Sequence, residues 1–301
     1  MRITFIHPAG FNFVPGQPDF SVLANRMAPI GILSLSAWLE QHGHECVVHD
    51  CLGPYAPRSL AENVDQILAT KPEMVGFSTT TSAFMDAVEM INLIRDRQPA
   101  MKVICGGAHV SAVGPTLLQH FPEIDYLCIG EGEAAMRDLA DGKPLHEVGN
   151  LVYRDGERIV ANPRRSRLKE LDELPFPAYE KLADFPHDYH LPIFSHIKRW
   201  GATMITSRGC PYTCTFYDRT VFERLYKYNH ETPARQIRCP PHQHVVRAAR
   251  YFSANQKEPG AAAGDFPLHP RQPLGLNPHF SPDMLNSLKK LKVIAEDKVY
   301  S

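Results

Sequence analysis

Short apolar runs alternate with segments of helical periodicity over the first 150 residues of the chain. Strands are predicted at residues 2–7, 45–49, 74–77, 102–105 and 126–129. Helices are predicted at residues 29–42, 59–70, 84–97 and 115–120, with a final helix after Glu133. Regular alternation of short strands and helices is typical of an α/β protein. The pattern therefore predicts a doubly wound, parallel, five-stranded sheet.

Small and polar residues follow the predicted strands, where a doubly wound sheet places its ligand crevice. These strand ends are His7-Pro8, Ser78-Thr79-Thr80, Gly106-Gly107 and Gly130-Glu131-Gly132. Glycine lets a ligand approach the backbone closely, and hydroxyl groups can bond a polar ligand. The same residue types also make turns and helix caps. Spacing alone leaves both interpretations open.

The pattern changes after residue 150. Residues 151–160 predict a β-hairpin around Asp155-Gly156, and the Pro-rich, charged stretch 162–190 predicts an ordered linker. Within this linker, the basic group Arg164, Arg165 and Arg167 favours a solvated face, with phosphate binding as the alternative. Residues 230–280 are rich in Pro, His, Gln and Arg and predict an irregular segment, before helical periodicity returns at 281–296.

Composition narrows the functional classes. The chain has 301 residues and a formal net charge of -1, which gives no electrostatic case for nucleic acid or a membrane surface. The N-terminal residues MRITFIHPAG indicate neither a signal peptide nor a membrane span, so a cytoplasmic protein is expected. Seven cysteines do not suggest a disulfide framework in this setting. Four of them, in or beside predicted strands, are expected to be small buried side chains.

A cysteine motif follows the predicted strand at residues 203–206. Cys210 and Cys214 have C-x3-C spacing in the sequence SRGCPYTC, and Tyr217 stands where a third cysteine would complete C-x3-C-x2-C. Three thiolates at that spacing hold a [4Fe-4S] cluster with one iron open for a ligand. A phenol is a poor substitute for a thiolate on iron. Two free thiols, or one redox pair, are the alternative interpretation of the two cysteines.

This motif, with its continuation Tyr217-Asp-Arg-Thr-Val-Phe222, resembles the cluster loop of radical S-adenosylmethionine (SAM) enzymes. The sequence before it is similar to the cobalamin-binding domain fused to many of these enzymes, which has a flavodoxin-like fold. The resemblance implies a cobalamin-binding domain at residues 1–145, a hairpin and linker at 146–195, and the start of a radical SAM domain at 196–229. The poorly matching segment 230–301 implies a truncated or degenerate radical SAM βα-barrel, or a frame-shifted copy.

The resemblance also implies the cofactors and the residues that hold them. Cobalamin, a [4Fe-4S] cluster and SAM are expected, with an external electron donor and a small-molecule substrate. Cys210 and Cys214 become candidate cluster ligands, and Tyr212 would lie against the cluster or the adenine. The candidate cobalamin contacts are Ser78, Thr79, Gly106, Gly107, His109, Gly130 and Glu131. For His7, a structural role at the strand end is favoured over cobalt ligation, because the D-x-H-x-x-G signature has Phe5 in place of Asp.

Three functional hypotheses follow. In the first, the protein cleaves SAM at a cluster and transfers a methyl group or closes a ring on a substrate that the sequence does not identify. In the second, it binds cobalamin without radical chemistry, because Tyr217 replaces the third thiolate. In the third, it is an α/β domain that binds neither cofactor, and its glycines and hydroxyls serve as turns and caps. The first hypothesis is the one the resemblance favours.

Overall fold

The computed structural model describes residues 1–10, 27–53, 55–57, 59–168, 171–182, 189 and 208. Its strands are β1 (Arg2–His7), β2 (Glu45–Asp50), β3 (Met74–Ser78), β4 (Lys102–Gly106), β5 (Tyr126–Cys128), β6 (Leu151–Asp155) and β7 (Arg158–Ala161). Its α-helices are α1 (Ile30–Gln41), α2 (Leu60–Ala69), α3 (Phe84–Arg97), α4 (Ala108–Val113), α5 (Thr116–His120) and α6 (Glu133–Ala140). Short 3-10 turns lie at Leu145–Glu147, Leu171–Glu173 and Tyr179–Lys181. The five strands and the helices expected between them are confirmed; α4 was not predicted.

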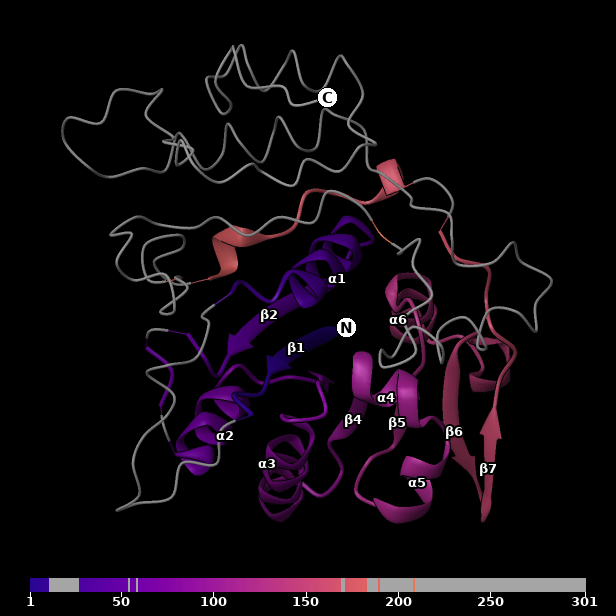
Figure 1. Cartoon of the computed structure of the whole chain (residues 1–301), viewed down its shortest axis with the longest axis horizontal. Coiled ribbons are helices and arrows are strands. Elements are labelled where there is room, and N and C mark those ends of the chain that lie inside the picture. The colour runs from indigo at the N-terminus through magenta and orange to yellow at the C-terminus, as the bar shows by residue number, and fades with distance from the viewer. Residues whose placement is uncertain are drawn as a thin grey trace, which may run out of the picture.

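The strands form one sheet in the order β2-β1-β3-β4-β5-β6-β7 (Figure 1). The first five strands are parallel, whereas β6 is antiparallel to β5 and β7 is antiparallel to β6. The prediction of five parallel strands is correct for β1–β5 but wrong for the whole sheet, which has seven strands of mixed direction. The predicted hairpin forms and pairs with β5, so the edge of β5 is covered rather than left with unpaired backbone groups.

Successive residues of β1 face opposite sides of the sheet, and each side packs against its own helices. Ile3 and Phe5 join a buried cluster with residues of α1 and α6. Ile6 joins a second buried cluster with residues of α2 and α3. Helices therefore cover both faces of the parallel part, as a doubly wound sheet requires.

The direction of winding reverses at β1. The chain passes from β1 to β2 on one side and then to β3 on the other side of β1. In open α/β sheets, ligands bind beside the carboxyl ends of the strands at such a switch point. The topology of the sheet alone therefore indicates a ligand site beyond the carboxyl ends of β1 and β3.

Basic residues in the segment after β7 bind acceptors in the preceding α/β domain. Arg165 pairs with the buried carboxylate of Asp138, which also accepts a hydrogen bond from Lys143 Nζ at 2.6 Å. Arg164 Nη1 donates to the backbone oxygen of Ile129 at 2.9 Å. The expectation of a solvated face is therefore wrong for these two arginines, because both bind acceptors of the folded domain.

None of the helices in the described part of the chain combines the length and the hydrophobicity that a membrane span needs.

Candidate functional site

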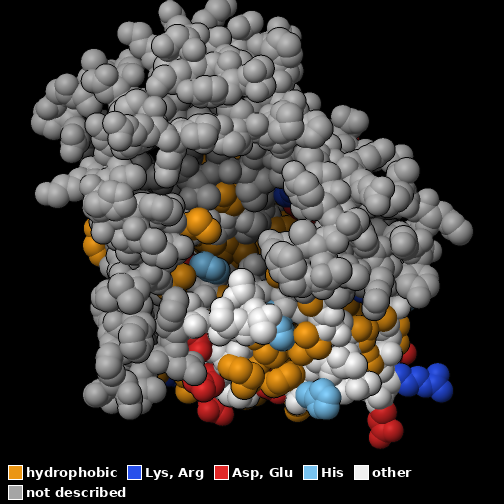
Figure 2. Space-filling model, in the orientation of Figure 1, with side chains coloured by type: hydrophobic (Ala, Val, Ile, Leu, Met, Phe, Trp, Pro, Cys, Tyr) orange, Lys and Arg blue, Asp and Glu red, His pale blue; other side chains and the backbone are white. Residues whose placement is uncertain are grey.

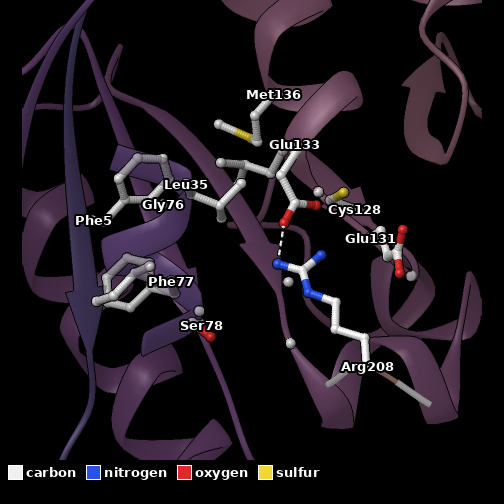
Figure 3. A pocket seen from close by; sticks show the side chains of 17 residues that line it. Phe5, Leu35, Gly76, Phe77, Ser78, Cys128, Glu131, Glu133, Met136 and Arg208 are labelled. Carbon is white, nitrogen blue, oxygen red and sulfur yellow. Dashed lines mark hydrogen bonds and ion pairs between the residues drawn. The ribbon is translucent and has the colours of Figure 1, made fainter. Parts of the chain in front are cut away.

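A cavity of about 200 Å³ lies between the sheet and the helices α1 and α6. Strands β1, β3 and β4 and the residues around the end of β5 form one wall, and the two helices form the other (Figure 3). The described residues that line it are Phe5, Gly31, Ile32, Leu35, Gly76, Phe77, Ser78, Ile104, Gly106, Gly107, Cys128, Gly130, Glu131, Gly132, Glu133, Met136 and Arg208. In the space-filling view, hydrophobic side chains of described residues gather on the lower part of the face shown (Figure 2).

Glycines keep the strand wall of the cavity thin. At Gly106, an added Cβ would meet only ordinary contacts, with Cys128 O at 3.6 Å as the nearest atom. The side of β4 at this position is therefore open to a ligand. Gly107 differs: its φ is +94°, and a Cβ there would lie 2.7 Å from both the backbone N and O of Thr79. Gly107 is thus required by the packing of the two loops, whether or not a ligand binds.

Five of the seven predicted cobalamin contacts lie together in this cavity: Ser78, Gly106, Gly107, Gly130 and Glu131. They come from the ends of β3, β4 and β5, which the parallel topology brings to one edge. Their direct contact with a cofactor stays a prediction, but their convergence on one cavity follows from the structure.

Thr79 and His109 are not among the described residues that line the cavity. The Thr79 hydroxyl donates to Gly106 O at 3.1 Å, and the Thr79 N–H donates to the same oxygen at 2.9 Å. His109 packs its ring against Phe84, with the centroids 4.4 Å apart, and its Nδ1 lies 3.2 Å from Thr81 Oγ1. These contacts join the loops after β3 and β4, so both residues support loops that line the cavity without being part of the lining.

The sequence reasoning missed most of the apolar wall. Phe5 and Ile104 from the strands face Ile32, Leu35 and Met136 from the helices. All five fit the apolar periodicity that predicted the elements. Periodicity says that a side chain faces the interior, but not whether it meets another side chain or a cavity.

Polar groups at the far side of the cavity are tied to the fold. Glu131 accepts a hydrogen bond from the backbone N–H of Leu168 at 3.0 Å. Glu133 is in the first turn of α6, its side chain is only 7% exposed, and it pairs with Arg208 Nη2 at 2.6 Å (Figure 3). Burial and the charge of Glu133 raise the pKa of the Cys128 thiol to about 12. Cys128 therefore contributes a neutral thiol to the wall.

His7 lies at the end of β1 and is anchored by a buried carboxylate. Its Nδ1 is 2.9 Å from Asp50 Oδ1, and Asp50 Oδ2 accepts a hydrogen bond from the Tyr189 hydroxyl at 2.9 Å. Among the described residues that line the cavity, His7 does not occur. These contacts support the structural role that the sequence favoured for it.

The candidate cluster ligands Cys210 and Cys214, and the neighbouring Tyr212, lie outside the described residues. Within the ranges that the structure does describe, no three His, Cys, Asp or Glu side chains gather as a metal site. The cluster therefore rests on the sequence motif.

Comparison with known protein families identifies the domain. The family model of the B12 binding domain matches residues 17–140. The chain contains a B12-binding domain. The residues that line the cavity fall within this match, apart from Phe5 of β1 and Arg208, which is contributed by the sequence just before Cys210. The assignment agrees with the expected cobalamin-binding domain.

The B12-binding domain and the sequence after it are homologous to cobalamin-dependent radical SAM enzymes. The chain is 28% identical over 192 residues to an uncharacterised methyltransferase of Pyrococcus horikoshii, covering 62% of this chain and 40% of that protein. It is 27% identical over 239 residues to the anaerobic magnesium-protoporphyrin IX monomethyl ester cyclase of Rubrivivax gelatinosus, covering 75% of this chain and 40% of the cyclase. It is 27% identical over 190 residues to the cobalamin-dependent radical SAM methyltransferase TokK of Streptomyces tokunonensis, covering 61% and 27%. The chain thus spans less than half of each of these three relatives.

A solved structure shares the fold. The cobalamin-dependent S-adenosylmethionine radical enzyme OxsB, solved with aqua-cobalamin bound, superimposes with a TM-score of 0.60 at 18% sequence identity. The match covers 84% of this chain and 32% of OxsB. At this identity the likeness establishes the architecture.

Proposed function

We propose that the B12-binding domain holds cobalamin with its nucleotide tail in the cavity between the sheet and helices α1 and α6. The observation that carries the proposal is the convergence of three strand ends, with their glycines and Ser78, on one cavity at the switch point of the sheet. A ligand entering there passes the carboxyl edge of the sheet and reaches between the two layers.

The chemistry of the cavity suits that tail. A benzimidazole ring needs an apolar slot, and Phe5, Leu35 and Met136 supply apolar surface from both walls. A ribose and a phosphodiester need polar partners, and the Ser78 hydroxyl and the Arg208 guanidinium lie in the same lining. The open side of Gly106 leaves room for the ligand against β4.

For the chain as a whole, we propose a part in a cobalamin-dependent radical SAM enzyme. Cys210 and Cys214 would ligate the cluster, and Tyr212 would lie against the cluster or the adenine of SAM. Together, the cofactors of such enzymes supply methyl transfer or radical ring closure at an unreactive carbon, with electrons from an external donor. This proposal keeps the domains expected from the sequence, with cobalamin binding at 1–145, a linker at 146–195 and the start of the radical SAM part at 196–229.

A second candidate function is a cobalamin-binding protein without radical chemistry. Tyr217 at the third position of the cysteine motif favours it, because a phenol is a poor ligand for iron in place of a thiolate. Cys239 is the sole cysteine after the motif and is the alternative source of a third thiolate.

Anaerobic reconstitution with iron, sulfide and hydroxocobalamin tests both functions. Corrin absorbance that stays with the protein through gel filtration supports the proposed tail site, and its absence contradicts it. About four irons per chain with a broad thiolate-to-iron band would support the enzyme. Corrin bands without stoichiometric iron would favour the binding protein.

A Tyr217→Cys variant separates the two candidates further. If the natural chain binds cobalamin but no cluster, the Tyr217→Cys variant is expected to bind iron and cleave SAM. The natural chain is then expected to do neither. A Cys239→Ser variant of the natural chain is the matched control, because loss of iron there would identify Cys239 as the third ligand.

A further inference from the structure

Arg208 connects two parts of the sequence that the domain division separates. It lines the cavity of the B12-binding domain, yet it belongs to the sequence Ser207-Arg208-Gly209-Cys210, where the cysteine motif begins. Its Nη2 lies 2.6 Å from Oε1 of Glu133, a residue 75 positions earlier in the chain. Within the part of the chain that the structure describes, Arg208 is the residue nearest in sequence to the first cysteine of the motif.

The ion pair between Arg208 and Glu133 is largely buried. The exposed fractions of the side chains are 22% for Arg208 and 7% for Glu133. A carboxylate with so little exposure needs a partner, since an unpaired buried charge is strongly destabilising. Among the described residues that line the cavity, Arg208 is the single cation, beside the two acids Glu131 and Glu133.

The pairing of the Arg208 cation with the Glu133 carboxylate determines whether a ligand can displace Arg208. If a ligand in the cavity displaced Arg208, the Glu133 carboxylate would lose its cationic partner in a water-poor site. A ligand that leaves the ion pair in place avoids that cost. Arg208 is therefore expected to stay beside the ligand as part of the wall.

We propose that Arg208 is a coupling residue: its ion pair with Glu133 ties the start of the cysteine motif to the cobalamin cavity. Filling of the cavity and docking of this segment then stabilise one another, because the guanidinium that Glu133 holds in the cavity wall is also the polar partner proposed for the phosphodiester of the ligand. The effect of the ligand rests on the proposed cobalamin function. The anchoring itself does not depend on it.

Binding of hydroxocobalamin to the full chain tests the coupling. Glu133→Gln and Arg208→Gln are each expected to weaken binding about tenfold in a visible-absorbance titration. The double variant is expected to bind no more weakly than either single variant, because both remove one interaction. Arg97→Gln is the matched control: Arg97 pairs with Asp65 at 3.2 Å on the surface, away from the cavity, and binding should be unchanged.

Hydrogen–deuterium exchange tests the anchoring without cobalamin. Glu133→Gln leaves the sequence around Arg208 intact, so the peptide that spans residues 203–214 can be compared directly with that of the natural chain. Faster deuterium uptake in this peptide, with unchanged uptake in the β1 and β3 peptides, is expected. Unchanged uptake in the first peptide would overturn the anchoring.

The titration has three outcomes that contradict the coupling. Wild-type affinity in both single variants, tighter binding by Arg208→Gln, or additive losses in the double variant would overturn the coupling. If the natural chain binds no hydroxocobalamin, the proposed cobalamin function and the coupling to its cavity both fail. The exchange experiment then still decides whether Glu133 anchors Arg208.

Discussion

The ring of Phe5 lies directly over Gly76, its partner in the parallel register of β1 and β3. A Cβ added at Gly76 would come within 2.9 Å of Phe5 Cδ1, closer than carbon atoms can pack without movement. The glycine thus leaves room for the aromatic ring beside the strand, where the ring forms part of the cavity wall.

Gly76→Ala is expected to destabilise the fold by about 1–3 kcal/mol, because the added methyl group must displace the Phe5 ring in a packed core. It should also weaken hydroxocobalamin binding, since the displaced ring lies in the proposed tail site. Urea unfolding and an absorbance titration measure the two effects. Gly31→Ala is the stability control, because a Cβ there meets no atom within 4 Å and lies in a helix, where alanine is favoured. Equal stability of Gly76→Ala and the natural chain would contradict the packing argument.

The adjacent glycines of the β4 loop are expected to respond differently to substitution. Gly106→Val should change the free energy of unfolding by no more than about 1 kcal/mol, since a Cβ there makes only ordinary contacts with Cys128 and the residue borders the cavity. It should reduce hydroxocobalamin affinity at least tenfold by filling the ligand's place.

Gly107→Ala should instead destabilise the fold by about 2 kcal/mol or more, because of its positive φ and its approach to Thr79. Thermal unfolding of both variants and titration of the folded one make the comparison. Undiminished binding by Gly106→Val would argue against a tail in this cavity.

The thiols of the sheet should resist alkylation. Burial raises the pKa of Cys105, and burial together with Glu133 raises that of Cys128 to about 12. At pH 8 a thiol of that pKa is ionised in only roughly one molecule in ten thousand, and the thiolate is the reactive form. Iodoacetamide at pH 8 is therefore expected to leave both cysteines unmodified in the native protein and to modify both in guanidinium. Peptide mass spectrometry reads the result; rapid native modification of Cys128 would show an accessible thiolate instead.

His49 is expected to make stability sensitive to acid. Burial lowers its pKa below the ordinary value of 6.5, against the opposing effects of its hydrogen bond with Asn63 and the nearby Asp50. Since the folded state disfavours the protonated ring, the contribution of His49 is complete above pH 6.5. It is lost as the pH falls from there through the lowered folded pKa. The free energy of unfolding should thus decrease from pH 7.5 to pH 5.

His49→Gln provides the control for this dependence. Glutamine can still donate a hydrogen bond to Asn63 Oδ1, which lies 2.7 Å from His49 Nε2, but it does not titrate. Urea unfolding at the two pH values should show a smaller decrease in the variant. An equal decrease in both proteins would assign the acid sensitivity to other groups.

Local patterns determined much of the fold. Apolar runs and helical periodicity predicted the five parallel strands, and the small residues after β3, β4 and β5 predicted where the cavity lies. Both predictions work because periodicity and strand ends are properties of neighbouring residues, while the parallel topology brings the strand ends together. The cysteine motif and the resemblance it carries were also readable from the sequence alone.

Tertiary structure decided which of these residues meet across the fold. Whether the hairpin at Leu151–Ala161 pairs with β5 depends on contacts between elements, not on the turn that forms it. The same holds for the cavity wall of Phe5 and Leu35, because a periodic pattern does not distinguish a side chain that packs from one that borders a cavity. The ion pair between Arg208 and Glu133 joins residues 75 positions apart. Partners so distant are selected by burial and charge in the folded chain, which local sequence patterns do not encode.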